Sequence, residues 1–206
     1  MNTRILGKTL LAGAVFGALI ATQVSAQTAP PVRVRGTIEM VHGDELMVKS
    51  RDGKDVSIKL APEYSVTGVV KASLSDITVG KFVGIASMPQ SDGSLKAVEV
   101  VVFPEMARGS GEGHYAWDLE PGSMMTNATV ASEVASVNGP TLTLKHKDGS
   151  NDITVPKDVP IVTFGPGEKT LLVPGAHVFV PTMKQADGSL MASRVLVGKD
   201  GLTPPM

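Results

Sequence analysis

The segment HGDELMVKSRDGKDVSIKLAP, residues 42–62, recurs in altered form as NGPTLTLKHKDGSNDITVPKD, residues 138–158. A second matching pair follows, VGKFVGIASMPQSDGSLKAVEVVV at residues 79–102 and VPGAHVFVPTMKQADGSLMASRVLV at residues 173–197. The order of these segments and the position of their Asp-Gly pairs agree in both halves of the chain. Self-similarity at a fixed spacing is typical of an internal duplication, so the sequence predicts two copies of one structural unit.

Each unit is expected to consist of short β-strands. In VRVRGTIEM, residues 32–40, apolar and polar side chains alternate, which is the period of a half-buried strand. Asp-Gly accepts the positive φ angles of a hairpin turn, so Asp52 and Gly53 predict a hairpin between residues 46–50 and 56–60. Few aromatic residues and 22 glycines also favour short strands with tight turns over helices.

The second matching segment predicts another hairpin, formed by residues 82–88 and 95–103. Residues 61–78 are expected to connect the two hairpins, with one short helical turn at 74–77. About five strands per unit is the number found in a small closed or half-closed barrel. In the second unit Pro140 and Pro156 fall near strand ends, so its strand register stays open.

The order of motifs resembles that of a bacterial envelope family of unknown function whose members carry one or more small OB-like β-barrel domains. The shared motifs are an opening strand with an interior glycine, an xGxxLxV hairpin, a DG turn, a VGxxV strand and a closing DGSLxAxxV hairpin. The resemblance implies an all-β fold of two tandem OB-like five-stranded barrels, at residues 32–103 and 129–198. An ordered connector at residues 104–128 would join them, and residues 199–206 would form a C-terminal tail.

The first 26 residues have the pattern of an export signal. Arg4 and Lys8 precede an apolar stretch of about a dozen residues, and the small residues before Gln27 suit cleavage after Ala26. The apolar stretch is shorter than the roughly 20 residues needed to span a bilayer, so no membrane span is expected after cleavage. The sequence therefore predicts a periplasmic or secreted protein.

The charge and composition exclude several classes of function. The net formal charge is −1, and loss of the two basic leader residues makes the remainder more acidic, which gives no electrostatic attraction to nucleic acid. The chain has no cysteine, no Gly-x-Ser-x-Gly and no His-Glu-x-x-His motif, so we expect neither a disulfide framework nor an enzyme.

The connector holds the most distinctive stretch of the chain, RGSGEGHYAWDLEPGSMMTNAT, residues 108–129, with the single tryptophan. A flexible linker would lack such aromatic residues, so we expect the stretch to be ordered and to pack between the barrels. The leading hypothesis is a binding or interaction module whose recognition surface lies at the inter-barrel cleft. Its partner would be an envelope protein, a glycan or a small ligand, and the candidate contact residues are Glu112, His114, Tyr115, Trp117 and Asp118.

Two alternatives remain open at the level of sequence. Imidazole and thioether groups suit copper, so His114, Met124 and Met125 with nearby acidic residues are candidate ligands in a periplasmic copper-handling protein. Their spacing matches no established metal motif, and no cofactor is expected under the leading hypothesis. The other alternative is a purely architectural envelope protein that makes contacts through its sheet edges.

Overall fold

The computed structural model describes residues 31–137 and 139–206, and the predicted leader at residues 1–26 lies outside them. The described chain is all-β, with three single-turn 3-10 helices, η1 (Leu74–Asp76), η2 (Glu105–Ala107) and η3 (Lys169–Leu171). Within these residues, no helix has the length and apolar character needed to cross a membrane. The strands are β1 (Val32–His42), β2 (Glu45–Ser50), β3 (Asp55–Lys71), β4 (Phe82–Pro89), β5 (Leu95–Val102), β6 (Gly113–Ala116), β7 (Met124–Val134), β8 (Thr141–His146), β9 (Gly149–Thr154), β10 (Ile161–Gly165), β11 (His177–Lys184) and β12 (Leu190–Gly198).

The predicted hairpins form as expected from their turn residues. Strand β2 pairs with β3, and β4 pairs with β5 in antiparallel fashion. In the β4–β5 turn Gly93 has a φ of 83°, a conformation that glycine adopts without a steric penalty. The Asp92 carboxylate accepts hydrogen bonds from the backbone N–H and the hydroxyl of Ser94. The β11–β12 turn repeats this arrangement with Asp187 and Ser189.

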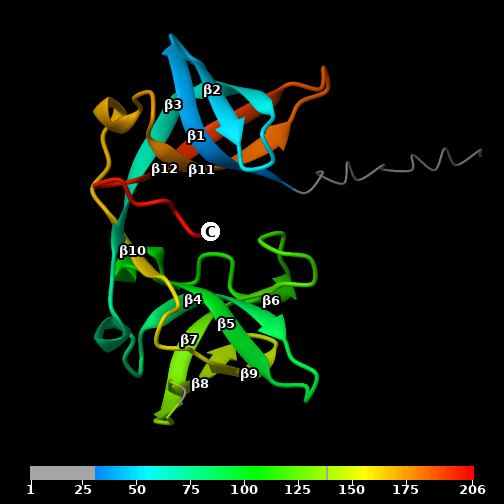
Figure 1. The fold of residues 1–206 in the computed structure, drawn as a ribbon, viewed down its shortest axis with the longest axis vertical. Coiled ribbons are helices and arrows are strands. Elements are labelled where there is room, and N and C mark those ends of the chain that lie inside the picture. The colour runs from blue at the N-terminus through cyan, green and yellow to red at the C-terminus, as the bar shows by residue number, and fades with distance from the viewer. Residues whose placement is uncertain (1–30, 138) are drawn as a thin grey trace, which may run out of the picture.

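The strands close into two rings, which we call barrel A and barrel B. In barrel A each strand is hydrogen-bonded to the next in the cyclic order β1, β2, β3, β12, β11. In barrel B the cyclic order is β4, β7, β8, β9, β5. Inward-facing apolar side chains fill each ring, for example Ile38, Leu46 and Ile58 in barrel A. Figure 1 shows barrel A above barrel B, with β3 and β10 running between them along one side.

This connectivity corrects the expectation that residues 32–103 and 129–198 each close a barrel of their own. The first range supplies β1–β3 to barrel A but β4 and β5 to barrel B, and the second range is divided in the same way. The cause is β3, whose residues Val66, Thr67, Val69 and Val70 favour extended backbone and continue the strand where a loop was expected. A strand of 17 residues spans about 55 Å, too long for one small barrel, so it carries the chain from barrel A to barrel B.

The two barrels have the same strand registers. Val83 of β4 lies opposite Val102 of β5, and Val178 of β11 lies opposite Val197 of β12. These pairs occupy corresponding positions of the two matching sequence segments. The β1–β2 and β7–β8 pairs also share a register shift at corresponding places. Each strand of one barrel therefore has a counterpart in the other, and residues at matching positions face matching directions.

A third apolar cluster lies between the barrels. Residues from the outer faces of both barrels meet there and are buried because the other barrel covers them. The tail at residues 199–206, red in Figure 1, also enters this seam. The Met206 side chain is only 4% exposed, and the backbone oxygen of Pro204 accepts a hydrogen bond from Arg51. The buried members of the cluster are Val69, Val101, Val162, Phe179, Leu196 and Met206, and Phe103, Trp117, Phe164 and Leu202 pack against them.

Candidate functional site

The connector crosses the seam and contacts both barrels. Its strand β6 pairs with β7 of barrel B. The loop that follows reaches barrel A, where the Asp118 carboxylate accepts a hydrogen bond from Arg35 at 2.7 Å and lies 3.3 Å from the Arg33 guanidinium. The Arg33 guanidinium also lies 4.0 Å from the centroid of the Trp117 ring. This packing agrees with the order expected from the aromatic content of the connector.

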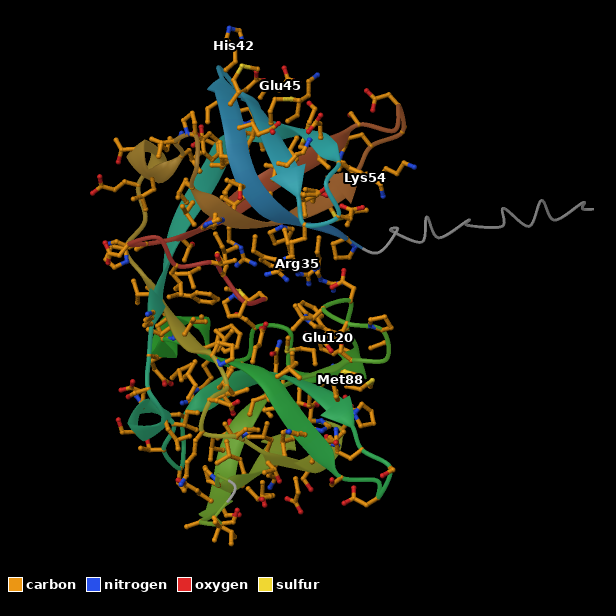
Figure 2. The ribbon with its side chains drawn as sticks, in the orientation of Figure 1. Arg35, His42, Glu45, Lys54, Met88 and Glu120 are labelled. Atoms are coloured by element: carbon orange, nitrogen blue, oxygen red, sulfur yellow. The ribbon has the colours of Figure 1, made fainter. Side chains whose placement is uncertain are left out.

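The charges around Asp118 stabilise its ionised form. Partial burial raises the pKa of this carboxyl group, but the hydrogen bond and charge of Arg35, together with the charge of Arg33, outweigh burial and leave the pKa below its ordinary value. Asp118 therefore remains negatively charged at neutral pH. Figure 2 shows Arg35 directed from barrel A into the space between the barrels.

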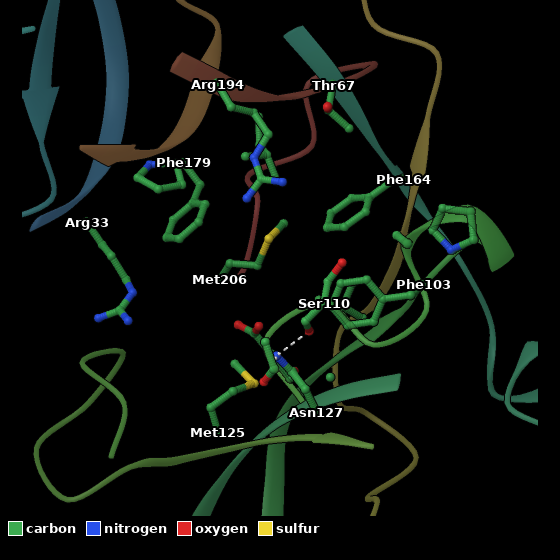
Figure 3. A pocket seen from close by; sticks show the side chains of 18 of the residues that line it. Arg33, Thr67, Phe103, Ser110, Met125, Asn127, Phe164, Phe179, Arg194 and Met206 are labelled. Carbon is green, nitrogen blue, oxygen red and sulfur yellow. Dashed lines mark hydrogen bonds between the residues drawn. The ribbon is translucent and has the colours of Figure 1, made fainter. Parts of the chain in front are cut away.

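A cavity of about 410 Å³ lies in the seam, within the size range of small-molecule sites. Its walls come from both barrels, from β10, from the connector and from the tail. Figure 3 shows Phe179 and Arg194 of barrel A facing Met125 and Asn127 of barrel B, with Met206 between them. The apolar walls include Val101, Phe103, Pro104, Met125, Phe164, Phe179, Pro181, Leu196 and Met206, and the polar side chains include Arg33, Thr67, Glu99, Ser110, Tyr115, Trp117, Asn127 and Arg194.

Glu99 is the most unusual residue of this cavity. Val100 and Val102 of β5 point into the core of barrel B, so the alternation of the strand turns Glu99 and Val101 outward to the seam. The Glu99 side chain is 0% exposed, and neither carboxyl oxygen has a hydrogen-bond partner among the described residues. Buried polar groups are normally paired, so an unpaired carboxyl group in a native fold needs a reason.

The surroundings of Glu99 favour its protonated form. Burial raises the pKa of the carboxyl group to about 8, although the charges of Arg35 and Arg51 act in the opposite direction. Relative to the ordinary value of 4.5, this shift means that ionisation in the folded state is disfavoured by about 5 kcal/mol. At neutral pH Glu99 is therefore mainly a neutral acid, which can donate one hydrogen bond and accept others.

Three further buried polar atoms lack partners within the described part of the chain. The indole Nε1 of Trp117 and the side-chain oxygen of Asn127 belong to residues that line the cavity, whereas the third, the Ser87 hydroxyl, does not. The Asn127 amide nitrogen is satisfied, since it donates to the carbonyl oxygen of Ser110 and to the hydroxyl of Tyr115 at 3.0 Å. Burial raises the pKa of Tyr115, so its hydroxyl stays neutral and keeps its own hydrogen for another acceptor. The cavity thus combines an apolar interior with several unused hydrogen-bonding groups.

The structure separates the predicted contact residues into two groups. Tyr115 and Trp117 line the cavity, and Asp118 anchors the connector to barrel A. Glu112 and His114 do not line it. The His114 ring nitrogen Nδ1 instead lies 2.8 Å from the Thr126 hydroxyl. Partial burial lowers the pKa of His114, and the nearby His146 lowers it further.

The structure divides the proposed copper ligands between the two faces of the β6–β7 pair. In the β6–β7 pair, His114 lies opposite Thr126 and Tyr115 lies opposite Met125. Because successive side chains of a strand point to opposite faces, Met125 lies on the cavity face with Tyr115. His114 and Met124 lie on the other face. Within residues 31–137 and 139–206, no group of three or more His, Cys, Asp or Glu side chains has the arrangement of a metal site. His146 lies near His114, with ring centroids 6.4 Å apart, but both of its nitrogens already have hydrogen-bond partners.

Sequence reasoning missed most of the cavity. Glu99 left a signal, because a single charge interrupts the apolar run of VEVVV. Asn127 and Arg194 left none, since polar residues that alternate with apolar ones are expected on the solvent face of a strand. Met206 belonged to the predicted tail, and no periodic pattern indicated that the tail returns to the seam.

Comparison of the chain with protein-family models, with curated proteins and with solved structures gave no match. The function is therefore inferred from the residues of the site itself.

Proposed function

We propose that the protein is a non-enzymatic binding module of the bacterial envelope that holds a small ligand in the cavity between barrels A and B. One observation carries the proposal: an apolar cavity of about 410 Å³ is lined by Glu99 and Trp117, whose buried polar atoms have no partner among the described residues. Apolar walls with a few convergent polar groups are the usual composition of a ligand site.

Both barrels are, under this proposal, OB-like domains that arose by internal duplication. The matching registers of β4–β5 and β11–β12, together with the matching sequence segments, support a common origin. Exchange of the last two strands between the two units would then place the cavity at the interface of two equivalent faces.

Export to the periplasm is part of the same proposal. Its support is the sequence of residues 1–26, with a basic start, a short apolar stretch and small residues before the expected cleavage point. The absence of cysteine is compatible with an oxidising compartment, where a protein without thiols needs no redox control.

A small ligand is favoured over a glycan or a protein partner by the direction of the aromatic side chains. A partner of either kind is recognised on an exposed surface, whereas Tyr115 and Trp117 turn toward the cavity and meet each other at a ring-centroid distance of 6.2 Å. The Trp117 face is already covered by the Arg33 guanidinium, which leaves less of it for stacking on a sugar.

The proposal is tested with N-phenyl-1-naphthylamine, a neutral dye whose emission rises in an apolar environment. Wild-type protein should bind the dye saturably at one site. Ser110→Phe places a ring at the cavity wall from an exposed position and should abolish this binding, whereas Ser91→Phe, on the β4–β5 turn away from the cavity, should leave it unchanged. Absence of saturable binding to the wild type, or equal binding to both variants, would contradict the proposal.

A further inference from the structure

The two faces that meet at the cavity are equivalent in fold but differ in charge. Gly84 pairs with Val101 in barrel B, and Phe179 pairs with Leu196 in barrel A. Glu99 lies two residues before Val101, and Arg194 lies two residues before Leu196. Glu99 and Arg194 therefore occupy matching positions in the two barrels. Barrel B thus presents a buried carboxyl group where barrel A presents a guanidinium group.

The charge of the cleft is positive. Arg33 of barrel A lines the cavity, and the charges of Arg35 and Arg51 act on Glu99 from the same barrel. Asp118 pairs with Arg33 and Arg35, while the backbone oxygens of Met206 and Pro204 accept hydrogen bonds from Arg35 and Arg51. Arg194 forms no ion pair within the described residues and points into the cavity between Phe179 and Phe164, as Figure 3 shows. An anion is therefore attracted to this space, whereas a cation is repelled by the guanidinium groups.

The unused hydrogen-bonding groups of the cavity are mainly donors, although the side-chain oxygen of Asn127 is an acceptor. Arg194 carries several N–H groups, the Trp117 indole nitrogen has one, and the Tyr115 hydroxyl keeps its hydrogen. Protonated Glu99 adds an O–H. A carboxylate has two oxygens that accept such bonds, and guanidinium groups bind it in bidentate geometry. The donors surround an interior made of Phe103, Phe164 and other apolar side chains, which suits a hydrocarbon body.

We infer that the cavity selects an amphiphilic anion, an apolar chain or ring system with a single carboxylate, whose headgroup lies between Arg194 and Glu99. This inference rests on the proposed function and names the ligand class of the same site. Met206 stands between the two barrel faces (Figure 3), so the headgroup reaches Glu99 by displacing this side chain.

Ligand binding at this position should depend on pH, because an ionised Glu99 would repel the headgroup. The charged or titratable groups around the headgroup position are Arg33, Arg35, Arg51, Arg194, Tyr115 and Asp118, which pairs with Arg33 and Arg35.

The test compares three ligands that share one chain and differ in the headgroup: octanoate, octan-1-ol and octylammonium. Each is titrated against dye-loaded protein, and the emission of Trp117, the single tryptophan, gives a second readout. Octanoate should displace the dye at a concentration at least about tenfold lower than octan-1-ol, with octylammonium the weakest. Octanoate affinity should fall as the pH rises through about 8, the pKa of Glu99.

Variants separate the headgroup contacts from the fold. Arg194→Gln should weaken octanoate binding by at least about fivefold and leave octan-1-ol binding unchanged. Lys184→Gln, which removes an exposed charge that does not line the cavity, should change neither. Glu99→Gln should keep octanoate binding at neutral pH and remove its pH dependence, an outcome that a purely structural role would not produce.

The outcomes distinguish this inference from the proposed function. Dye binding with equal displacement by all three ligands, or with octylammonium the strongest, would overturn the anion inference and leave the binding module intact. Failure of the dye to bind at all would overturn both. An unchanged pH dependence in Glu99→Gln would remove Glu99 from the headgroup site.

Discussion

The buried, unpaired carboxyl group of Glu99 should make the free energy of unfolding depend on pH. Its pKa is about 8 in the folded protein and 4.5 in the reference state, so the folded state holds a proton that the unfolded state releases between these values. Stability therefore falls as the pH rises through this window, by about 1.4 kcal/mol per pH unit. The loss relative to acidic pH is about 3 kcal/mol at neutral pH and reaches about 5 kcal/mol above pH 8. Glu99→Gln has no such proton and should not show this loss.

The assay is urea denaturation of the wild type and of Glu99→Gln at a series of pH values from about 5 to about 9. The difference in the free energy of unfolding between the two proteins should be small at the acidic end and grow steadily in favour of the variant. Glu63→Gln, a substitution at an exposed glutamate of β3, serves as the matched control and should show no such trend. A difference that stays constant over the whole range would refute the account of Glu99 as a desolvated, unpaired acid.

Four further substitutions test the packing of the strands and of the cleft between the barrels, each by urea denaturation. Gly36→Ala should destabilise the protein by more than about 2 kcal/mol, because the new Cβ would lie 2.0 Å from the carbonyl oxygen of Lys49. Gly165→Ala meets only ordinary contacts at 3.7 Å and should change stability by less than about 1 kcal/mol, so equal effects of the two would be inconsistent with the β1–β2 register. Asp118→Asn should cost about 1 kcal/mol or less, since this side chain is 46% exposed, and the effect should shrink in high salt. Trp117→Ala should cost about 2 kcal/mol through lost packing in the seam, and a value within error of zero would mean that the connector does not hold the barrels together.

The sequence was sufficient to predict the local elements of the fold. The alternation at residues 32–40 and the Asp-Gly turns led to the hairpins, and the short helical turn expected at residues 74–77 corresponds to η1. These features depend on contacts between neighbours in the chain. Turn residues and periodicity therefore determine them without knowledge of the whole molecule.

The exchange of strands between the barrels could not be predicted in this way. A barrel can be closed by strands of one sequence repeat or by strands exchanged between the two repeats. Because matching strands have matching registers, the pattern of apolar and polar side chains is the same for both arrangements. The difference lies in the conformation of residues 61–71. Val66, Val69 and their neighbours favour an extended strand, but β-propensity alone does not say which barrel the strand enters next.

The candidate site was predicted in part. The expectation that aromatic residues of the connector lie at the inter-barrel cleft agrees with the positions of Tyr115 and Trp117. Glu99 and Arg194 were missed because they lie on outer strand faces that would meet solvent in an isolated barrel. Glu99 is buried, and Arg194, which stays exposed, lines the cavity, only because the two barrels meet, which is a property of the assembled fold.

A crystal structure of the protein with octanoate would show directly where the headgroup and the chain of the ligand lie. We expect the carboxylate within hydrogen-bond distance of the Arg194 guanidinium and the Glu99 carboxyl group, and the hydrocarbon chain among Phe103, Phe164 and Phe179. Octanoate bound only on an outer surface, with the cavity between the barrels unchanged, would show that the cavity is not its site.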